Sequence, residues 1–88
     1  MVKGKTESGF EFEIEEAQLD DMEFMEALSD VQDDPLAFPK VCRMLLGEEQ
    51  KKKLYDHFRD ENGKVPIAAV NEAITEIMTV SGEKLKNS

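Results

Sequence analysis

The chain has 88 residues, with 11 Lys and Arg against 20 Asp and Glu, and its formal net charge is −9. This length predicts a single domain, with a radius of gyration of about 12 Å, and leaves room for one small core. The negative charge argues against nucleic acid and against an anionic membrane surface, because affinity for both comes largely from basic side chains.

The compartment is predicted from the cysteine count and from the apolar runs. Cys42 is the only cysteine, so it cannot form an internal disulfide, and its neighbours do not make a metal motif. The N-terminus has no charged-then-apolar leader, and no apolar run is long enough to span a bilayer. We therefore expect a protein of a reducing cytoplasm.

The first predicted element is a strand at residues 10–14, Phe-Glu-Phe-Glu-Ile, in which apolar and acidic side chains alternate. Residues 1–9 are expected to form a polar arm before a folded core at residues 10–80. A lone strand is unstable in water, so this one needs a neighbour. That neighbour is either residues 2–6, folded back as a hairpin through residues 7–9, or a second chain.

The strand is also a candidate surface for self-association. Its apolar face, Phe10, Phe12 and Ile14, is large for so small a domain to cover alone, and a strand edge carries unpaired backbone groups. We expect it to support a dimer or a larger ring. The alternative is a monomer in which an internal hairpin packs on the first helix.

A first helix is expected after Asp20, which can cap it, with Glu23 as the second half of a capping box. Pro35 ends this segment, because proline cannot continue a helix. The apolar residues of the helix fall at Met22, Met25 and Leu28 and, less regularly, at Phe24 and Val31. Methionines usually fill a core, but they also suit adaptable binding surfaces.

Asp34 and Pro35 predict the start of a second helix, a capping carboxylate followed by a proline. This helix is expected to run to Leu46, where Gly47 closes it as a left-handed cap. Pro39 leaves two possibilities: the helix begins only there, or Pro39 lies in its first turns. The side chains expected to face inward include Leu36, Val41 and Leu45.

A third helix is predicted from Glu48 to about Arg59, followed by a turn at residues 60–63. Pro66 opens a fourth helix, which Ser81-Gly82 is expected to end before a loose tail at residues 81–88. The apolar face of the fourth helix comprises Ile67, Val70, Ile74, Ile77 and Met78. The side chains expected to be most buried in the whole domain are Val41, Leu45, Leu46, Leu54, Leu28, Val70, Ile74 and Ile77. The chain is therefore predicted to be mainly α: a small bundle of about four short helices preceded by an N-terminal β-strand or hairpin.

The turn between the third and fourth helices partly matches the calcium-binding loop of an EF-hand. Asp60, Asn62 and Gly63 fit positions three, five and six of an EF-hand. Positions one and twelve, however, are Phe58 and Ala69, where the ion needs a carboxylate and a bidentate glutamate. We therefore predict ordinary turn chemistry and no metal site.

No catalytic or cofactor-binding residue is predicted. His57 is the only histidine and is expected to be a solvated helix residue, since no serine elbow accompanies it. Cys42 has apolar neighbours and is expected to be a small core residue. The acidic run at residues 11–21 is interpreted as a solvated face or as a docking surface for a basic partner.

Several local runs resemble those of small proteins encoded in the tail gene cluster of long-tailed bacteriophages, the tail assembly chaperones of siphovirus-type phages and prophages. The resemblance covers roughly Phe10 to Thr79. The runs are Leu19-Asp20-Asp21-Met22-Glu23, Asp33-Asp34-Pro35-Leu36, Leu45-Leu46-Gly47-Glu48-Glu49-Gln50, Leu54 to His57, and Arg59-Asp60-Glu61-Asn62-Gly63-Lys64-Val65-Pro66.

The resemblance implies a non-enzymatic helper in the bacterial cytoplasm. Such chaperones bind the tape measure protein, help to recruit tail tube subunits, self-associate, and are absent from the finished virion. They are often made in a second, frameshifted form, and Leu85-Lys86-Asn87 can be encoded by a slippery run. The residues expected to bind partners are Phe10, Phe12, Ile14, Met22 and Met25.

One other class of function competes with this interpretation. A small acidic adaptor or regulator that binds a single cellular protein would show the same composition, whereas an enzyme is disfavoured. The identity of the neighbouring genes separates the first two classes, because a tape measure gene immediately downstream favours the chaperone.

Overall fold

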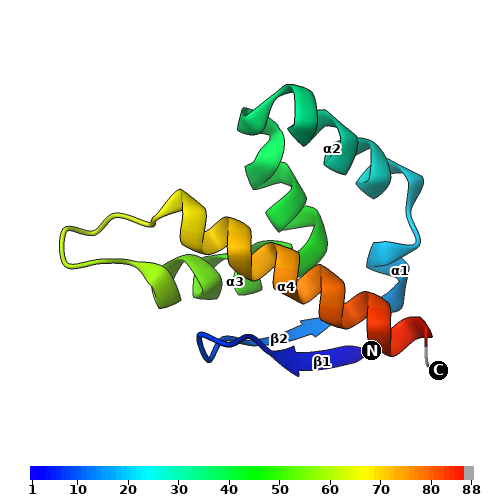
Figure 1. Cartoon of the computed structure of the whole chain (residues 1–88), viewed down its shortest axis with the longest axis horizontal. Coiled ribbons are helices and arrows are strands. Elements are labelled where there is room, and N and C mark those ends of the chain that lie inside the picture. The colour runs from blue at the N-terminus through cyan, green and yellow to red at the C-terminus, as the bar shows by residue number, and fades with distance from the viewer. Residues whose placement is uncertain (87–88) are drawn as a thin grey trace.

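The computed structural model describes residues 1–86 of the chain, with side chains described as far as residue 83. It is mainly helical, with a short antiparallel hairpin at the N-terminus, so the predicted fold class is confirmed (Figure 1). Its radius of gyration is 12.8 Å and its extents are 41 × 29 × 19 Å. The elements in chain order are β1 (Val2–Lys5), β2 (Glu11–Ile14), α1 (Glu16–Leu19), α2 (Met22–Asp33), the 3₁₀ turn η1 (Pro35–Ala37), α3 (Phe38–Phe58) and α4 (Ile67–Lys86).

The first nine residues belong to the fold, and the expectation of a polar arm is wrong. Residues 2–5 pair with residues 11–14 in an antiparallel register, from Val2 opposite Ile14 to Lys5 opposite Glu11. The turn is closed by Thr6, whose backbone N–H donates to Phe10 O at 2.9 Å and whose Oγ1 accepts from Phe10 N at 3.1 Å. Of the two pairings left open, the hairpin within one chain is therefore the one observed.

The hairpin is covered by helices from its own chain. In Figure 1, β1 runs beside the C-terminal half of α4, and β2 contacts α3. Phe10, Phe12 and Ile14 are only 6%, 2% and 0% exposed. The apolar face that appeared too large to cover is therefore buried within the monomer.

Helix α2 begins one residue later than expected. Asp20 ends the short α1, which was not predicted, and Asp21 is the cap of α2, accepting from Glu23 N at 2.9 Å. Of the two roles left open for the methionines of α2, core and surface, Met22 and Met25 lie on the surface and are 70% and 61% exposed. The residues that pack inward follow the helical spacing i, i+3, i+4, i+7, and they are Phe24, Ala27, Leu28 and Val31.

Helix α3 consists of two helical halves that meet at Gly47, where φ is 81° and ψ is 167°. The predicted glycine boundary between two helices is confirmed, but the expected left-handed cap is wrong, because a ψ of 167° lies outside the left-handed helical region. Asp34 caps η1 by accepting a hydrogen bond from Leu36 N at 3.1 Å. Pro39 lies in the first turn of α3, which confirms the second of the two possibilities for this proline. Leu36 was expected to face inward and is 87% exposed, because it lies in the 3₁₀ turn and not in an α-helix.

Helix α4 continues past the expected end at Ser81-Gly82, so that boundary was wrong. Ser81 lies within α4 and is fully buried, at a position where its small side chain fits against the core. Residues 81–86, expected to be a loose tail, are helical, while 87 and 88, which include the Asn of the Leu85-Lys86-Asn87 run, lie outside the described residues. Ile67 fits the helical period but is 81% exposed.

The core lies between the hairpin, α3 and α4. Seven of the eight side chains expected to be most buried are buried, and the exception, Leu28, is partly exposed. The hairpin contributes more to the core than the sequence indicated. The buried hydrophobic side chains that were not in the expected set are Val2, Phe10, Phe12, Ile14, Phe24, Ala27, Cys42 and Ala73.

Candidate functional site

A largely apolar groove lies between α2, the first half of α3 and α4. Its volume is about 290 Å³. The apolar side chains that line it are Leu28, Val31, Phe38, Val41, Ile74 and Met78, and the polar ones are Asn71, Thr75 and Thr79. We call this hollow the α2–α4 groove. All of its lining residues belong to α2, α3 and α4.

The two helical walls of the groove differ in charge. The stretch from Asp21 to Asp34 contains six carboxylates and no Lys or Arg, and all six carboxylate side chains are exposed. The α4 wall is neutral. Its two threonines bond back to their own helix, Thr75 Oγ1 to Asn71 O and Thr79 Oγ1 to Thr75 O, each at 2.9 Å. The lining of the groove is therefore uncharged, whereas the six exposed carboxylates of residues 21–34, which we call the acidic wall, lie outside the lining on and beside the helix that contributes Leu28 and Val31.

A second candidate surface is the outer edge of β2. Because Thr6 and Phe10 form a hydrogen-bonded pair, Glu11 and Glu13 direct their backbone groups away from β1. The edge is partly occupied by Gln50 of α3. Its Oε1 accepts from Glu13 N and its Nε2 donates to Glu13 O, both at 2.8 Å. The side-chain amide thus makes the two hydrogen bonds that a neighbouring strand would make.

The space beside this edge is wide and charged. It has a volume of about 610 Å³ and is lined by three lysines and three glutamates, besides Gly4, Phe12 and Gln50. Lys3 and Glu13 pair across it at 3.7 Å. An added β2 strand from a second copy would place Glu11 and Glu13 against like charges and would first have to displace Gln50. Homo-oligomer formation stays a prediction, but the structure does not favour β2 as its interface.

The five residues predicted to bind partners are not brought together. Phe10, Phe12 and Ile14 lie in the core, whereas Met22 and Met25 lie on the exposed side of α2. The residues that line the α2–α4 groove were not singled out for binding. The helical spacing of residues 24, 27, 28 and 31 could have indicated the α2 side of the groove. No pattern in the sequence indicates the role of Gln50.

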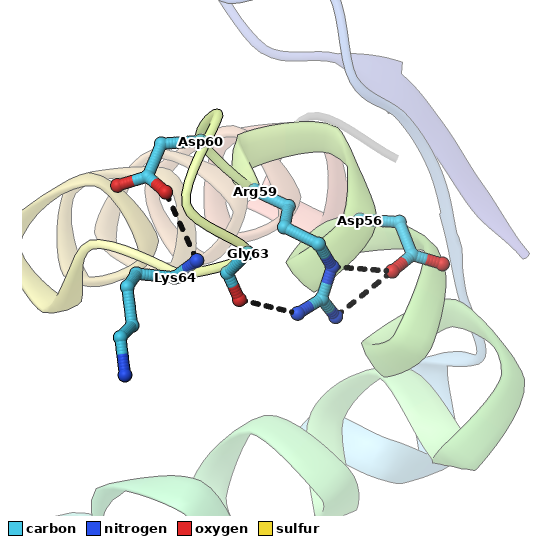
Figure 2. Close-up of polar contacts among 5 residues, drawn as sticks. All are labelled: Asp56, Arg59, Asp60, Gly63 and Lys64. Carbon is cyan, nitrogen blue, oxygen red and sulfur yellow. Dashed lines mark hydrogen bonds and ion pairs between the residues drawn. The ribbon is translucent and has the colours of Figure 1, made fainter.

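The loop between α3 and α4 shows ordinary turn chemistry, as predicted. Asp60 Oδ1 accepts from Asn62 N and from Lys64 N, both at 2.9 Å. Figure 2 shows Arg59 beside it, donating to Asp56 Oδ1 and to Gly63 O at 3.0 Å each. The Asp60 oxygen is therefore used by the turn itself. In the described part of the chain, no three His, Cys, Asp or Glu side chains are grouped as a metal site would require.

The two candidate reactive side chains lie in different surroundings. Cys42 is fully buried, as expected for a core residue, and burial raises the pKa of its thiol to about 11. His57 is exposed, with Nε2 3.1 Å from Ser8 O, and its ring packs against Phe10 and Phe58. The thiol therefore keeps its proton at neutral pH, and the imidazole fastens α3 to the hairpin turn.

Among residues 1–86, no helix is both long and apolar enough to cross a membrane. No protein-family model, curated protein or solved structure matches the chain. Its function must therefore be argued from the surfaces described above.

Proposed function

We propose that this chain is a non-enzymatic tail assembly chaperone of a long-tailed bacteriophage, which binds the tape measure protein and aids assembly of the tail tube. The observation that carries the proposal is the α2–α4 groove, an apolar hollow that the described chain leaves uncovered. A small acidic domain with an open apolar groove is suited to binding a helix.

The chemistry of the groove matches what a tape measure protein presents. Such a protein is a long helical chain, and its apolar seams need cover until the tail is assembled. The groove offers partly buried aliphatic and aromatic side chains, among them Val31, Phe38 and Met78, to one face of such a helix. The net charge of −9 keeps a complex with exposed apolar surface in solution, because like-charged complexes repel one another.

The reactive side chains support a role without catalysis. The only thiol is buried and protonated, since burial raises the pKa of Cys42 to about 11. The only imidazole, that of His57, is engaged with a backbone carbonyl at 3.1 Å. A buried, protonated thiol and an imidazole held by a backbone carbonyl do not form the activated nucleophile that covalent catalysis uses.

The proposal is tested by co-expression with the tape measure protein encoded beside it. We expect the tape measure protein to stay soluble and to co-purify with the tagged chain, and a tail tube subunit to join this complex. Thr75→Arg places a long cation in the groove from an exposed position of α4, so the fold should be kept and co-purification lost. Asn62→Arg makes the same charge change in the α3–α4 loop and should leave co-purification unchanged.

Two results would overturn the proposal. One is a folded wild-type chain that leaves the tape measure protein insoluble and does not co-purify with it. The other is a complex that Thr75→Arg and Asn62→Arg affect equally, because the groove would then not be the binding site. Far-ultraviolet circular dichroism of each variant shows whether the helices are retained.

A further inference from the structure

A second apolar hollow adjoins the α2–α4 groove. Its volume is about 200 Å³, and it is lined by Phe38, Pro39, Tyr55, Val65, Ile67 and Val70. Phe38 lines both hollows, so a single apolar surface extends from the beginning of α4, across Phe38, to α2. The two hollows therefore adjoin at Phe38.

The outer end of this surface is unusually exposed. Ile67 is 81% exposed although it belongs to the apolar period of α4 and lines the second hollow. A single exposed aliphatic residue is ordinary on a protein surface. Here, however, the residue continues a line of apolar side chains that leads into a hollow, and such a line is typical of a surface that a partner covers.

We propose that both hollows are filled by one basic amphipathic helix, whose bulky apolar side chains contact the two hollows and whose Lys and Arg residues lie along α2. This inference rests on the proposed function and specifies the partner segment. A helix presents apolar side chains at i, i+3, i+4 and i+7 along one face. Side chains spaced in this way can enter two neighbouring hollows at once.

The charge distribution selects this occupant. The acidic wall at residues 21–34 carries six carboxylates and no cation, so a helix with a basic flank gains favourable electrostatic contacts there. A second copy of this chain would present carboxylates in turn, because its net charge is also −9. An anionic lipid surface is disfavoured for the same reason.

The inference is tested with two fluorescent synthetic peptides, titrated with the full chain and followed by anisotropy. Both are idealised amphipathic helices with leucine on one face; one has lysine on the flanks and the other has glutamate. We expect the lysine peptide to bind at least about tenfold more tightly than the glutamate peptide. Binding should also weaken at high salt, because the acidic wall is exposed.

A matched pair of substitutions tests the second hollow. Ile67→Ser removes an exposed aliphatic side chain from it, and we expect the dissociation constant of the lysine peptide to rise about tenfold. Leu36→Ser is the control, because Leu36 is 87% exposed and lines neither hollow. Since both residues are on the surface, both variants should keep the fold, which circular dichroism verifies.

The results separate this inference from the proposed function. Equal binding of the lysine and glutamate peptides, or equal effects of Ile67→Ser and Leu36→Ser, would overturn the inference. If the tape measure protein co-purifies while neither peptide binds, the inference fails and the proposed function stands. If the lysine peptide binds as described while the tape measure protein does not co-purify, the proposed function fails and the docking surface stands.

Discussion

Replacement of Gly47 by alanine isolates the energetic cost of the break in α3. The φ of 81° and ψ of 167° at Gly47 lie in a region that is essentially restricted to glycine. A Cβ built at this position has no heavy atom within 4 Å, so a steric clash contributes nothing. Whatever stability the variant loses therefore comes from the backbone conformation.

The magnitude follows from two opposing effects. Holding alanine in this conformation costs about 1–3 kcal/mol. Alanine also lowers the conformational entropy of the unfolded chain, which stabilises the folded state by about 0.4–1 kcal/mol. From the middle of each range, the free energy of unfolding of Gly47→Ala should fall by about 1.3 kcal/mol, and Tm should fall by about 4–8 °C for each kcal/mol in a domain of this size.

Gly82→Ala is the matched control. Gly82 lies within α4, has no positive φ, and also leaves open space for a Cβ. Alanine there should raise the free energy of unfolding by about 0.5–1 kcal/mol, since glycine is the poorer helix former. Urea denaturation followed by circular dichroism measures both variants. Gly47→Ala with unchanged or increased stability would refute the argument, because α3 would then have no break at that residue.

Four further predictions concern the core, the strand edge, a buried hydroxyl and the thiol. Ile74→Ala should lower the free energy of unfolding by about 2–5 kcal/mol, because Ile74 is 2% exposed; a change near zero in urea denaturation would contradict the assigned inner face of α4. Gln50→Ala should lower it by about 1–3 kcal/mol, through the loss of two hydrogen bonds to Glu13, and should free the β2 edge. Sedimentation should then show more self-association for this variant than for the wild type, and the reverse order would refute the role of Gln50. Ser81→Ala should stabilise the protein by about 1 kcal/mol, because Ser81 Oγ is buried without a hydrogen-bond partner among the described residues; a loss of stability on thermal denaturation would show that the hydroxyl is bonded. The pKa of Cys42 rises from 9.0 to about 11 on folding, so between these values the native state holds more protons than the unfolded state and stability falls as pH rises. A Cys42→Ala variant should lose that part of the pH dependence in urea denaturation at pH 8 to 11.

The local signals in the sequence were sufficient to place most of the helices. The Asp34-Pro35 pair, Gly47 and Pro66 mark boundaries that the structure retains, because each acts through backbone geometry within one turn. The Ser81-Gly82 pair failed as a stop signal. There α4 packs against β1 and α3, and this tertiary packing outweighs the weak helix propensity of the glycine.

The sequence left the inner face of α2 open for a different reason. Counting the period from Met22 directs Met22 and Met25 inward, whereas counting from Phe24 directs Ala27 and Val31 inward. Both readings have helical spacing, and only the packing of an aromatic ring against the core decides between them. The inward register is therefore a tertiary effect that this short amphipathic segment does not encode on its own.

The candidate site was the least predictable part of the molecule. Its groove combines residues of α2 with residues of α4 that are more than forty positions away, such as Val31 and Thr75. The pairing of Gln50 with the backbone of Glu13 joins residues 37 positions apart and depends on no repeating pattern. Contacts of this kind follow from the arrangement of whole elements, which periodicity along a single segment does not contain.

The small thickness of the molecule has a consequence for how it could act. A shortest extent of 19 Å corresponds to about two layers of helix, each roughly 10 Å across. No described helix in such a slab is covered on all sides, so α2, α3 and α4 each keep an exposed face beside the buried core. A partner helix would act as the missing third layer. A bound partner and the folded domain would then stabilise one another, and dissociation of the partner would return the domain to a less stable state.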